Sequence, residues 1–406
     1  LDLEWARDRR LESPTRSAGP RVIRSSHLGE GTPSDTVVQL LESGAPADGI
    51  LKVVVSATLT VAIQHLLPLA ERDTTPRAVL LTTGPSGSLF RAWARRLRLP
   101  WVYASLPEQP GRPYALPVEP TQIPVDRLQP YLAVEDAPMF ALLGHPVAHS
   151  RSPAIHHRWM ARQGRVGLYT VLDVGSAEEF QLALQELPRR GVRGVNVTHP
   201  WKGLAFRCTA QKSPDALEAG TANTLTFQND GISADNTDLG AIKRRLGELH
   251  ESGIWDGDRV TVLGAGGAAR ATLAAVRRLG AHATVCARRD EAATSLAEQF
   301  GAEVGDADHP VPASLVVHAT SVGRTDSGPL EVPLRPLVTD RSYVLDWVYA
   351  AGSRSVSDTA RQAGARYEDG TRLLVYQAVE SYRAWWGEAP DPESVEVALA
   401  EVACTE

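Results

Sequence analysis

The sequence predicts an α/β protein built from two or three domains. Its 406 residues exceed what one ordinary hydrophobic core organises, at about 150 residues per domain. Short apolar runs alternate with amphipathic stretches through most of the chain, which is typical of parallel sheets covered by helices. In the second half, a glycine-rich turn separates an apolar run from a helix, the pattern of a nucleotide-binding unit.

The composition is that of a soluble globular protein. Hydrophobic residues make up 43% and charged residues 22%, and no apolar run approaches the roughly 20 residues of a membrane helix. The net charge of −6 is spread along the chain, without the basic patch of a nucleic-acid binder. We therefore expect small-molecule partners, with no nucleic acid and no membrane.

The cysteines give no sign of a metal site or of a disulfide framework. Cys208, Cys286 and Cys404 lie far apart, without the spacing of zinc ligands, so we expect no metal and a reducing, cytoplasmic setting. The sequence begins at Leu1 without an initiator methionine or a signal-peptide pattern, and we expect it to start inside a longer polypeptide.

The first segment, residues 1–135, has the pattern of a partial (β/α)8 barrel. Amphipathic stretches such as 35–43 and 89–97 lie between apolar runs, and each run with its helix predicts one βα unit. The five units fall three short of a closed barrel. The predicted strands are residues 1–5, 21–24, 50–55, 78–81 and 101–104.

Two of these runs carry residues whose side chains could take part in a reaction, His27 and Lys52. A lysine inside an apolar strand loses much of its hydration, which favours the neutral amine that attacks ketones. The alternative is a lysine that extends from an edge strand to solvent. Other motifs of this segment are Ser26 with His27, residues 32–34, Arg91 after the turn at 84–87, and residues 120–123.

Together these motifs resemble the C-terminal part of type I 3-dehydroquinate dehydratases, which are (β/α)8 Schiff-base lyases. The resemblance implies that Lys52 forms an imine with the substrate and that His27 moves the proton. It also implies that Arg91 and Gln122 hold the substrate carboxylate and hydroxyls. The first three βα units of that family are absent from the sequence, and the alternative is a docking or scaffolding module.

A proline-rich stretch between residues 106 and 138 separates this segment from the rest of the chain. We place the first domain boundary near residues 135–138. A second domain then covers residues 136–245, joined by a C-terminal helix at 372–400, and a third domain covers residues 246–371.

The second domain begins with a predicted buried strand at residues 140–144. Ser150 and Ser152 follow it, just before a helix start marked by Pro153, where free backbone N–H groups favour an anionic ligand. One of the two serines is expected simply to cap the helix.

Further strands at 169–174, 194–198, 222–225 and 232–235 end in polar side chains. The carboxyl ends of parallel strands meet at one edge of a sheet, where ligands of open α/β sheets bind. We therefore expect Lys202 and Asp238 to form the reacting pair of a hydride-transfer enzyme. The other polar residues at these strand ends are Asn196, Thr198, Asn223 and Asp235.

The order of these motifs resembles that of shikimate dehydrogenases over residues 140–390. The motifs are residues 149–156, 196–202, 223–225, 236–240, 346–349 and 370–377. The resemblance implies a substrate domain plus a Rossmann NADP domain, with Lys202 and Asp238 at the hydroxyl that is oxidised. It assigns substrate binding to Ser150, Ser152, Thr198, Asn223, Asp238, Gln377 and Tyr349.

The cofactor domain is predicted by a strand at 258–263, a tight turn, and a helix at 271–279. The glycines of the turn allow a pyrophosphate to approach, and the helix N-terminus stabilises it. Arg288 and Arg289 end the next strand where an NAD site usually has an acid, so they favour the 2′-phosphate of NADP, although Asp290 follows them. The turn residues are Gly264, Ala265, Gly266, Gly267 and Ala268.

Residues 318–323 resemble the Asn-Ala-Thr-Ser-x-Gly loop that shikimate dehydrogenases place near the nicotinamide. His318 replaces the asparagine, and we interpret it as a substitute that bonds to the backbone, not as a catalyst. The resemblance assigns Thr320 and Gly370 to cofactor binding.

The activity implied is the NADP-dependent, reversible reduction of 3-dehydroshikimate to shikimate, next to dehydration of 3-dehydroquinate by the first segment. Lys202 would donate a proton to the ketone oxygen or stabilise the developing alkoxide. The alternative is a quinate or broad-specificity dehydrogenase. We expect a monomer or a homodimer.

Overall fold

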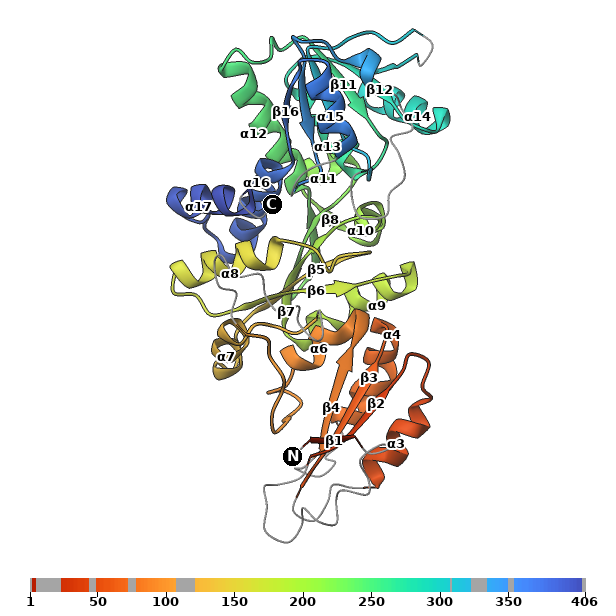
Figure 1. Cartoon of the computed structure of the whole chain (residues 1–406), viewed down its shortest axis with the longest axis vertical. Helices are drawn as coiled ribbons and strands as arrows, with labels where there is room; N and C mark the ends of the chain where they lie inside the picture. Colours follow the sequence, from red (N-terminus) through yellow and green to blue (C-terminus); the bar gives the residue numbers. More distant parts are fainter. Residues whose placement is uncertain are drawn as a thin grey trace. The chain divides into compact units, whose positions relative to one another are not determined.

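The chain divides into two compact units, Leu1–Pro153 with Gly164–Val195, and Ala154–Gln163 with Asn196–Glu406. Each unit is described separately below, and Figure 1 labels their elements. The computed structural model describes residues 2–4, 23–43, 49–71, 78–106, 121–306, 309–322, 334–349 and 354–403.

The N-terminal part of the first unit is a parallel sheet of order β1-β2-β3-β4. Its pairing places Ser25, Lys52 and Val79 opposite one another on three adjacent strands. Its strands are β1 (Asp2–Glu4), β2 (Ile23–Leu28), β3 (Ile50–Ser56) and β4 (Ala78–Thr83). Its helices are α3 (Ser34–Glu42), α4 (Leu59–Val61), α5 (Leu67–Glu71), α6 (Gly87–Ala92) and α7 (Val125–Ala133), with a π-helical turn at Ala62–Leu66.

The prediction of a fifth strand in this segment, at residues 101–104, is wrong. The described residues of the N-terminal sheet contain four strands, and beyond β4 the chain forms only an isolated bridge between Ser105 and Pro124. The backbone of Ser105 exchanges hydrogen bonds with Ile123 and Val125, so these groups are not available to extend the sheet. The helix predicted to reach residue 97 ends earlier, since α6 stops at Ala92.

The rest of the first unit begins the substrate-domain sheet. Its strands are β5 (Met139–Gly144), β6 (Leu168–Asp173) and β7 (Val192–Val197), and every residue of β5 is buried. Helix α9 (Ala177–Glu186) starts at Ser176, whose hydroxyl accepts the Glu179 N–H at 3.2 Å, as an N-cap does. Within this unit, α6 packs on β6, and Ser88 donates a hydrogen bond to the Val171 carbonyl.

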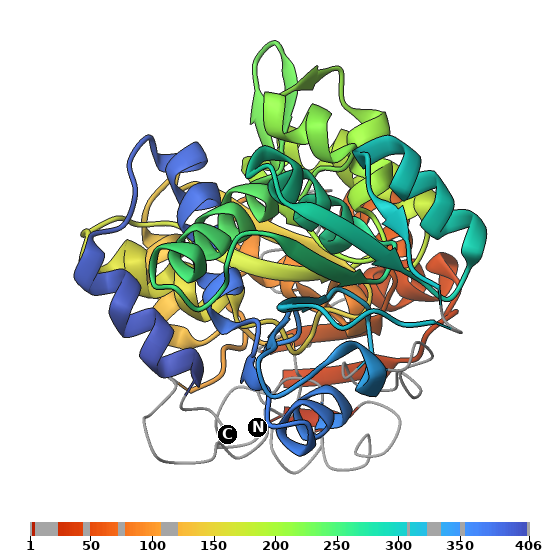
Figure 2. The ribbon, with the colours of Figure 1, turned by 90° about the horizontal axis from the view of Figure 1, so that it is seen from above.

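In the second unit, the last residues of β7 continue the sheet to β9 (Thr224–Gln228), β10 (Gly231–Asp235) and β8 (Gln211–Lys212). The full strand order is β6-β5-β7-β9-β10-β8, and β9 and β10 form the antiparallel pair. Helices α12 and α16 lie side by side (Figure 2, green and blue). The helices around this part are α8 (Ser152–Arg162), α10 (Lys202–Cys208), α11 (Pro214–Ala219), α12 (Thr237–Glu251), α16 (Thr371–Trp386) and α17 (Pro392–Ala403).

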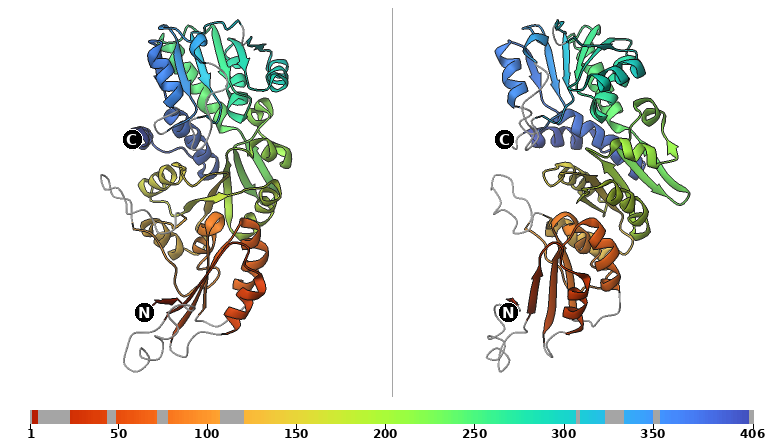
Figure 3. Two further views of the ribbon diagram at one scale, coloured as in Figure 1. Left: turned by 45° about the vertical axis from the view of Figure 1, so that its right-hand side comes forward. Right: turned by 90° about the vertical axis from the view of Figure 1, so that its right-hand side faces the viewer.

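The second unit also contains a parallel six-stranded sheet of order β13-β12-β11-β14-β15-β16, with helices on both faces (Figure 3). The Rossmann-type prediction is confirmed, including the strand, turn and helix around the glycines. The strands are β11 (Arg259–Leu263), β12 (His282–Cys286), β13 (Glu303–Val304), β14 (Leu315–His318), β15 (Tyr343–Asp346) and β16 (Arg366–Glu368). The helices are α13 (Gly267–Arg278), α14 (Asp290–Phe300) and α15 (Arg354–Gln362).

Across the described ranges, the structure has no helix that is both long enough and apolar enough to cross a membrane.

Candidate active site

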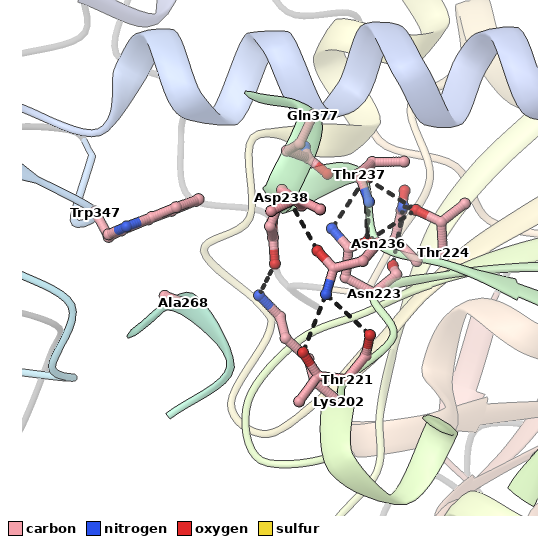
Figure 4. Close-up of polar contacts among 12 residues, drawn as sticks. Lys202, Thr221, Asn223, Thr224, Asn236, Thr237, Asp238, Ala268, Trp347 and Gln377 are labelled. Atoms are coloured by element: carbon pink, nitrogen blue, oxygen red, sulfur yellow. Dashed lines mark hydrogen bonds and ion pairs between the residues drawn. The ribbon is translucent and has the colours of Figure 1, made fainter. Parts of the chain in front are cut away.

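Lys202 and Asp238 form an ion pair in the second unit. The lysine Nζ lies 2.6 Å from the carboxylate Oδ2, and the side chains are 19% and 5% exposed. Lys202 is the first residue of α10, and Asp238 lies in the first turn of α12. Figure 4 shows the two groups facing each other, with Gln377 and Ala268 nearby. Lys202 and Asp238, which are 36 positions apart in the sequence, therefore form the pair that the sequence predicted.

The N-terminus of α12 fixes the position of the carboxylate. Asn236 caps this helix, and its side-chain oxygen accepts the Leu239 N–H at 3.0 Å. The amide nitrogen of the same side chain donates to the carbonyl and the hydroxyl of Thr221, at 2.9 and 3.0 Å. A carboxylate in the first turn also interacts favourably with the positive end of the helix dipole.

Asn223 ties β9 to the same helix start. Its side-chain oxygen accepts the backbone N–H of Thr237 at 2.7 Å, and its amide nitrogen contacts the Thr237 hydroxyl at 3.0 Å. Asn196 donates to the Thr224 hydroxyl at 3.0 Å. Because an amide carries two N–H groups, Asn223 keeps donor capacity for a ligand after these contacts.

Thr198 and Gln377 complete the predicted substrate residues of the second unit. Thr198 follows β7 directly and is partly exposed. Gln377 lies on α16, is 8% exposed, and donates to the Leu374 carbonyl at 2.7 Å. Figure 4 shows its side chain next to the start of α12. Tyr349 lies just after β15 and is also partly exposed.

The glycine-rich turn lies against the aliphatic part of Lys202. A Cβ on Gly267 would come within 2.8 Å of the Lys202 Cδ, so a larger residue there would require the lysine side chain to shift. Gly264 has φ +116°, in the region that favours glycine. Gly266 caps α13 without a side-chain hydrogen bond, which leaves the first N–H groups of α13 to a phosphate. Ala265 and Ala268 belong to the same turn.

Arg288 and Arg289 follow β12 and are both exposed. The next helix, α14, starts at Asp290, which lies in its first turn. Two exposed guanidinium groups at the end of the strand beside β11 suit the 2′-phosphate of NADP.

The interpretation of His318 as a residue that bonds to the backbone is corrected by its side-chain contacts. The ring Nδ1 lies 2.7 Å from Asp346 Oδ1, and Nε2 lies 2.6 Å from the Thr320 hydroxyl. The contact with Asp346 follows from the sheet, because Asp346, on the neighbouring strand β15, is the register partner of His318. Gly370, the N-cap of α16, lies close to the backbone of Trp347, where a Cβ would meet the carbonyl oxygen at 2.4 Å.

Ser150 and Ser152 belong to the first unit. The Ser150 hydroxyl accepts the backbone N–H of Ser152 at 3.2 Å, and Ser152 is the first residue of α8. One serine therefore does contribute to the turn at the helix start, as expected, while Ser152 is 5% exposed.

The predicted dehydratase residues also lie in the first unit. Lys52 is 4% exposed, and its Nζ lies 5.1 Å from the centre of the Tyr103 ring. Since Lys52 pairs with Ser25, His27 lies on the same face of the sheet one pleat further along and is exposed. Arg91 is 2% exposed and donates to the carbonyl oxygens of Thr82 and Gly87, and Gln122 is partly exposed.

Sequence reasoning missed Thr221 and the partners of His318. Thr221 has no motif of its own, and only its bond to the helix cap Asn236 shows its role. Among the described residues, no group of three or more histidine, cysteine, aspartate or glutamate side chains could hold a metal ion. Of the cysteines in the described part, Cys208 and Cys286 carry free thiols, while Cys404 lies outside it, as do Gly323 and residues 107–120.

A parallel Rossmann-type sheet whose glycine-rich turn contacts a lysine–carboxylate pair defines the class of dinucleotide-dependent α/β dehydrogenases. A family model described as the shikimate dehydrogenase substrate binding domain matches residues 142–225. The NADP-dependent shikimate dehydrogenase of Methylobacterium radiotolerans is 39% identical over 280 residues, covering 66% of this chain and 98% of that protein. The chain belongs to the shikimate dehydrogenase family.

Other relatives agree with this assignment. The enzyme of Xanthomonas campestris pv. campestris (strain B100) is 38% identical over 276 residues, 64% of this chain and 94% of the relative. The Thermus thermophilus shikimate 5-dehydrogenase, solved with NADP(H) and shikimate, is 33% identical with a TM-score of 0.57, covering 65% and 99%. A chorismate mutase/shikimate 5-dehydrogenase fusion from Clostridium acetobutylicum is 25% identical with a TM-score of 0.58, covering 66% and 97%. About a third of this chain lies outside each match.

Proposed function

We propose that this chain catalyses the reversible, NADP-dependent reduction of 3-dehydroshikimate to shikimate. The observation that carries the proposal is the Lys202–Asp238 pair, with 2.6 Å between amine and carboxylate, beside the glycine-rich turn. NADPH supplies a hydride to the ketone carbon when it is bound. The activities of the relatives support the same assignment.

In this proposal Lys202 acts on the substrate oxygen. As the ketone carbon gains a hydride, its oxygen gains negative charge and then a proton. A fixed ammonium group stabilises that charge where water is largely excluded, since the Lys202 side chain is 19% exposed. Asp238 holds the amine in place, and the proton reaches the oxygen from the ammonium group or through water.

The substrate would be bound by polar groups of several elements. We assign its carboxylate to the hydroxyls of Ser150 and Ser152, in line with the anion preference of a helix start. Its ring hydroxyls are assigned to Thr198, Asn223, Asp238, Gln377 and Tyr349. The Thermus thermophilus relative was solved with shikimate and NADP(H), which supports shikimate as the substrate and NADP as the cofactor in this proposal.

The cofactor is assigned to the third of three proposed domains, residues 246–371, after a first domain at 1–135 and a substrate domain at 136–245 joined by residues 372–400. Gly264, Ala265, Gly266, Gly267 and Ala268 would hold the pyrophosphate, Arg288 and Arg289 the 2′-phosphate, and Thr320 and Gly370 the nicotinamide end. We place the reaction in the cytoplasm, with the chain as a monomer or homodimer.

The test is a rate comparison of shikimate with quinate, each with NADP and with NAD, followed by cofactor absorbance. The proposal expects the largest kcat/KM for shikimate with NADP. A larger kcat/KM for quinate would favour the broad-specificity alternative, and no oxidation of either substrate would refute a dehydrogenase.

A second candidate function concerns the first segment and rests on the burial of Lys52 on the same sheet face as His27. In this proposal the Lys52 amine attacks the ketone of 3-dehydroquinate, and loss of water gives an iminium. His27 then removes the neighbouring proton, a hydroxide leaves as water, and hydrolysis of the iminium releases 3-dehydroshikimate.

Borohydride trapping in the full-length protein separates this lyase from a scaffolding module. Reduction of the iminium leaves a stable secondary amine on Lys52, which peptide mass spectrometry locates. An adduct on Lys52 would support the dehydratase, while its absence from a protein that still oxidises shikimate would favour the scaffold.

A further inference from the structure

A buried histidine–carboxylate pair lies at the carboxyl edge of the Rossmann-type sheet. His318 ends β14 and Asp346 ends β15, and the two residues are register partners. Both side chains are 0% exposed, with 2.7 Å between Nδ1 and Oδ1. On the other side of β14, the register partner of His318 is Leu263, the last residue before the glycine-rich turn.

The hydrogen bonds around His318 form a chain that runs from Thr320 through the imidazole ring to Asp346. Asp346 Oδ1 already accepts the Val348 N–H at 2.8 Å, so the carboxylate oxygen accepts again from the ring Nδ1–H. The Thr320 hydroxyl oxygen accepts the Val322 N–H at 3.1 Å, and its own hydrogen can be donated to Nε2. With Nδ1–H as donor and Nε2 as acceptor, each of these hydrogen bonds has one donor and one acceptor. The tautomer follows from the network of partners.

This chain of bonds ends in the segment that faces the glycine-rich turn. A Cβ on Gly264 would lie 2.7 Å from the Ala319 carbonyl oxygen and 3.2 Å from the Thr320 Cγ2. Ala319 also donates its N–H to the Leu263 carbonyl at 2.8 Å. The backbone of residues 319–322 is therefore held both from the turn and, through the Thr320 hydroxyl, from His318.

We propose that His318 is a positioning residue for NADP: with Asp346 it orders residues 319–322 before the cofactor binds. The inference rests on the proposed function, in which this segment meets the nicotinamide end. Binding to a segment that is already ordered loses less conformational entropy, so the affinity is higher. Loss of the imidazole frees the Thr320 hydroxyl and lets the segment fluctuate, which weakens NADP binding without changing shikimate binding.

The primary measurement is the NADPH dissociation constant, from the fluorescence of the bound cofactor in the absence of substrate. His318→Ala is expected to raise it about tenfold, which is about 1.4 kcal/mol. His318→Asn keeps an amide that can bond to one of the two partners and should recover most of the affinity. The matched control is His309→Ala, which removes an exposed histidine, 2.9 Å from Asp306, in the same domain. It should leave the constant unchanged.

A double-mutant cycle tests whether His318 acts through Thr320. Thr320→Val keeps the shape of the side chain and removes the hydroxyl, and it should also weaken NADPH. Combined with His318→Ala it should cost little more than either change alone, because both break the same chain. If His318→Ala does not fold, Thr320→Val and His318→Asn still decide the question through the same constant.

The outcomes separate this inference from the proposed function. NADPH affinity within twofold of wild type in His318→Ala and Thr320→Val, with only a lower melting temperature, would reduce His318 to a core residue and overturn the inference. A wild-type protein that binds NADPH but does not reduce 3-dehydroshikimate would refute the proposed activity, and the effect of His318 on the binding constant would stand. A wild type without NADPH binding would overturn both.

Discussion

Lys202 and Lys52 are the two lysines that the sequence marks as reactive, and their surroundings differ. The Lys202 amine lies 2.6 Å from the Asp238 carboxylate, at the starts of α10 and α12. Lys52 lies in the middle of β3 with its amine 5.1 Å from the Tyr103 ring centre, a cation–π geometry. The first is held by a carboxylate, and the second contacts an aromatic face.

The difference teaches that burial alone does not identify a reacting lysine. The surroundings of Lys202 bring together a helix cap, a carboxylate and the glycine-rich turn, which come from separate stretches of the chain. Buried polar groups cost free energy unless they are bonded, and such networks are retained mainly where they serve a purpose. Lys52 instead lies in the middle of a buried strand of the four-stranded sheet, on the same face as His27.

The same substitution at both lysines makes the contrast measurable, and the largest effect is expected at Lys202. Lys202→Met should lower kcat for shikimate oxidation about a thousandfold, because the charge that stabilises the alkoxide is lost. Its KM should change much less. Lys243→Ala, an exposed lysine of α12, is the control and should keep full activity. Unchanged turnover with a raised KM would leave Lys202 as a binding residue only.

Acid should affect the unit that carries Lys202 through His156. Burial, together with the charge of His157, lowers the pKa of His156 to about 3. In the unfolded chain His156 binds a proton near its ordinary pKa of 6.5. Its contribution to the free energy of unfolding is therefore fully present above pH 6.5 and is lost as the pH drops towards 3. Between pH 7 and 5 the loss from this group is about 2 kcal/mol.

Urea unfolding at pH 7 and pH 5 measures that loss. His156→Phe keeps a ring in the cluster with Trp159, Tyr382 and Trp385, and it should lose about 2 kcal/mol less than wild type between the two pH values. His282→Gln, at an exposed histidine of β12, should keep the wild-type dependence. An identical pH dependence in all three proteins would contradict a neutral His156.

A smaller effect tests the contact between helices α4 and α9 within the first unit. Glu179 is 8% exposed, and its two oxygens accept the N–H groups of Thr60 and Gly175 at 3.1 and 3.0 Å. Glu179→Gln turns one acceptor into a donor, so we expect a loss of about 1.5 kcal/mol of unfolding free energy. Glu178→Gln, an exposed neighbour, should lose less than half of that. Equal losses would show that the Thr60 contact is dispensable.

The smallest effect is expected at Lys52. Lys52→Met keeps the length of the side chain and should leave shikimate oxidation within twofold of wild type, since the Lys202–Asp238 pair lies in the other unit. It should also abolish any borohydride adduct formed with 3-dehydroquinate. A large loss of shikimate oxidation in a folded Lys52→Met protein would contradict the expectation that only Lys202 serves this reaction.

Local pattern accounts for much of what could be predicted. The turn at Gly264 follows from a strand, closely spaced glycines and a helix, all within about 20 residues. The stretches that follow β7 and β10, which lead into Lys202 and Asp238, are marked by apolar runs that break into polar residues. Such signals are contiguous in the sequence, so periodicity and turn chemistry suffice to find them.

Only the tertiary structure decided which polar groups meet. His318 and Asp346 are 28 residues apart and bond because β14 and β15 are neighbours in the sheet. The predicted strand at 101–104 does not form, because Ser105 instead makes backbone hydrogen bonds to the segment around Ile123. The sequence pattern of neither stretch predicts this pairing. Pairing between distant segments depends on the whole packed chain, whereas a strand or a glycine turn depends mainly on its own residues.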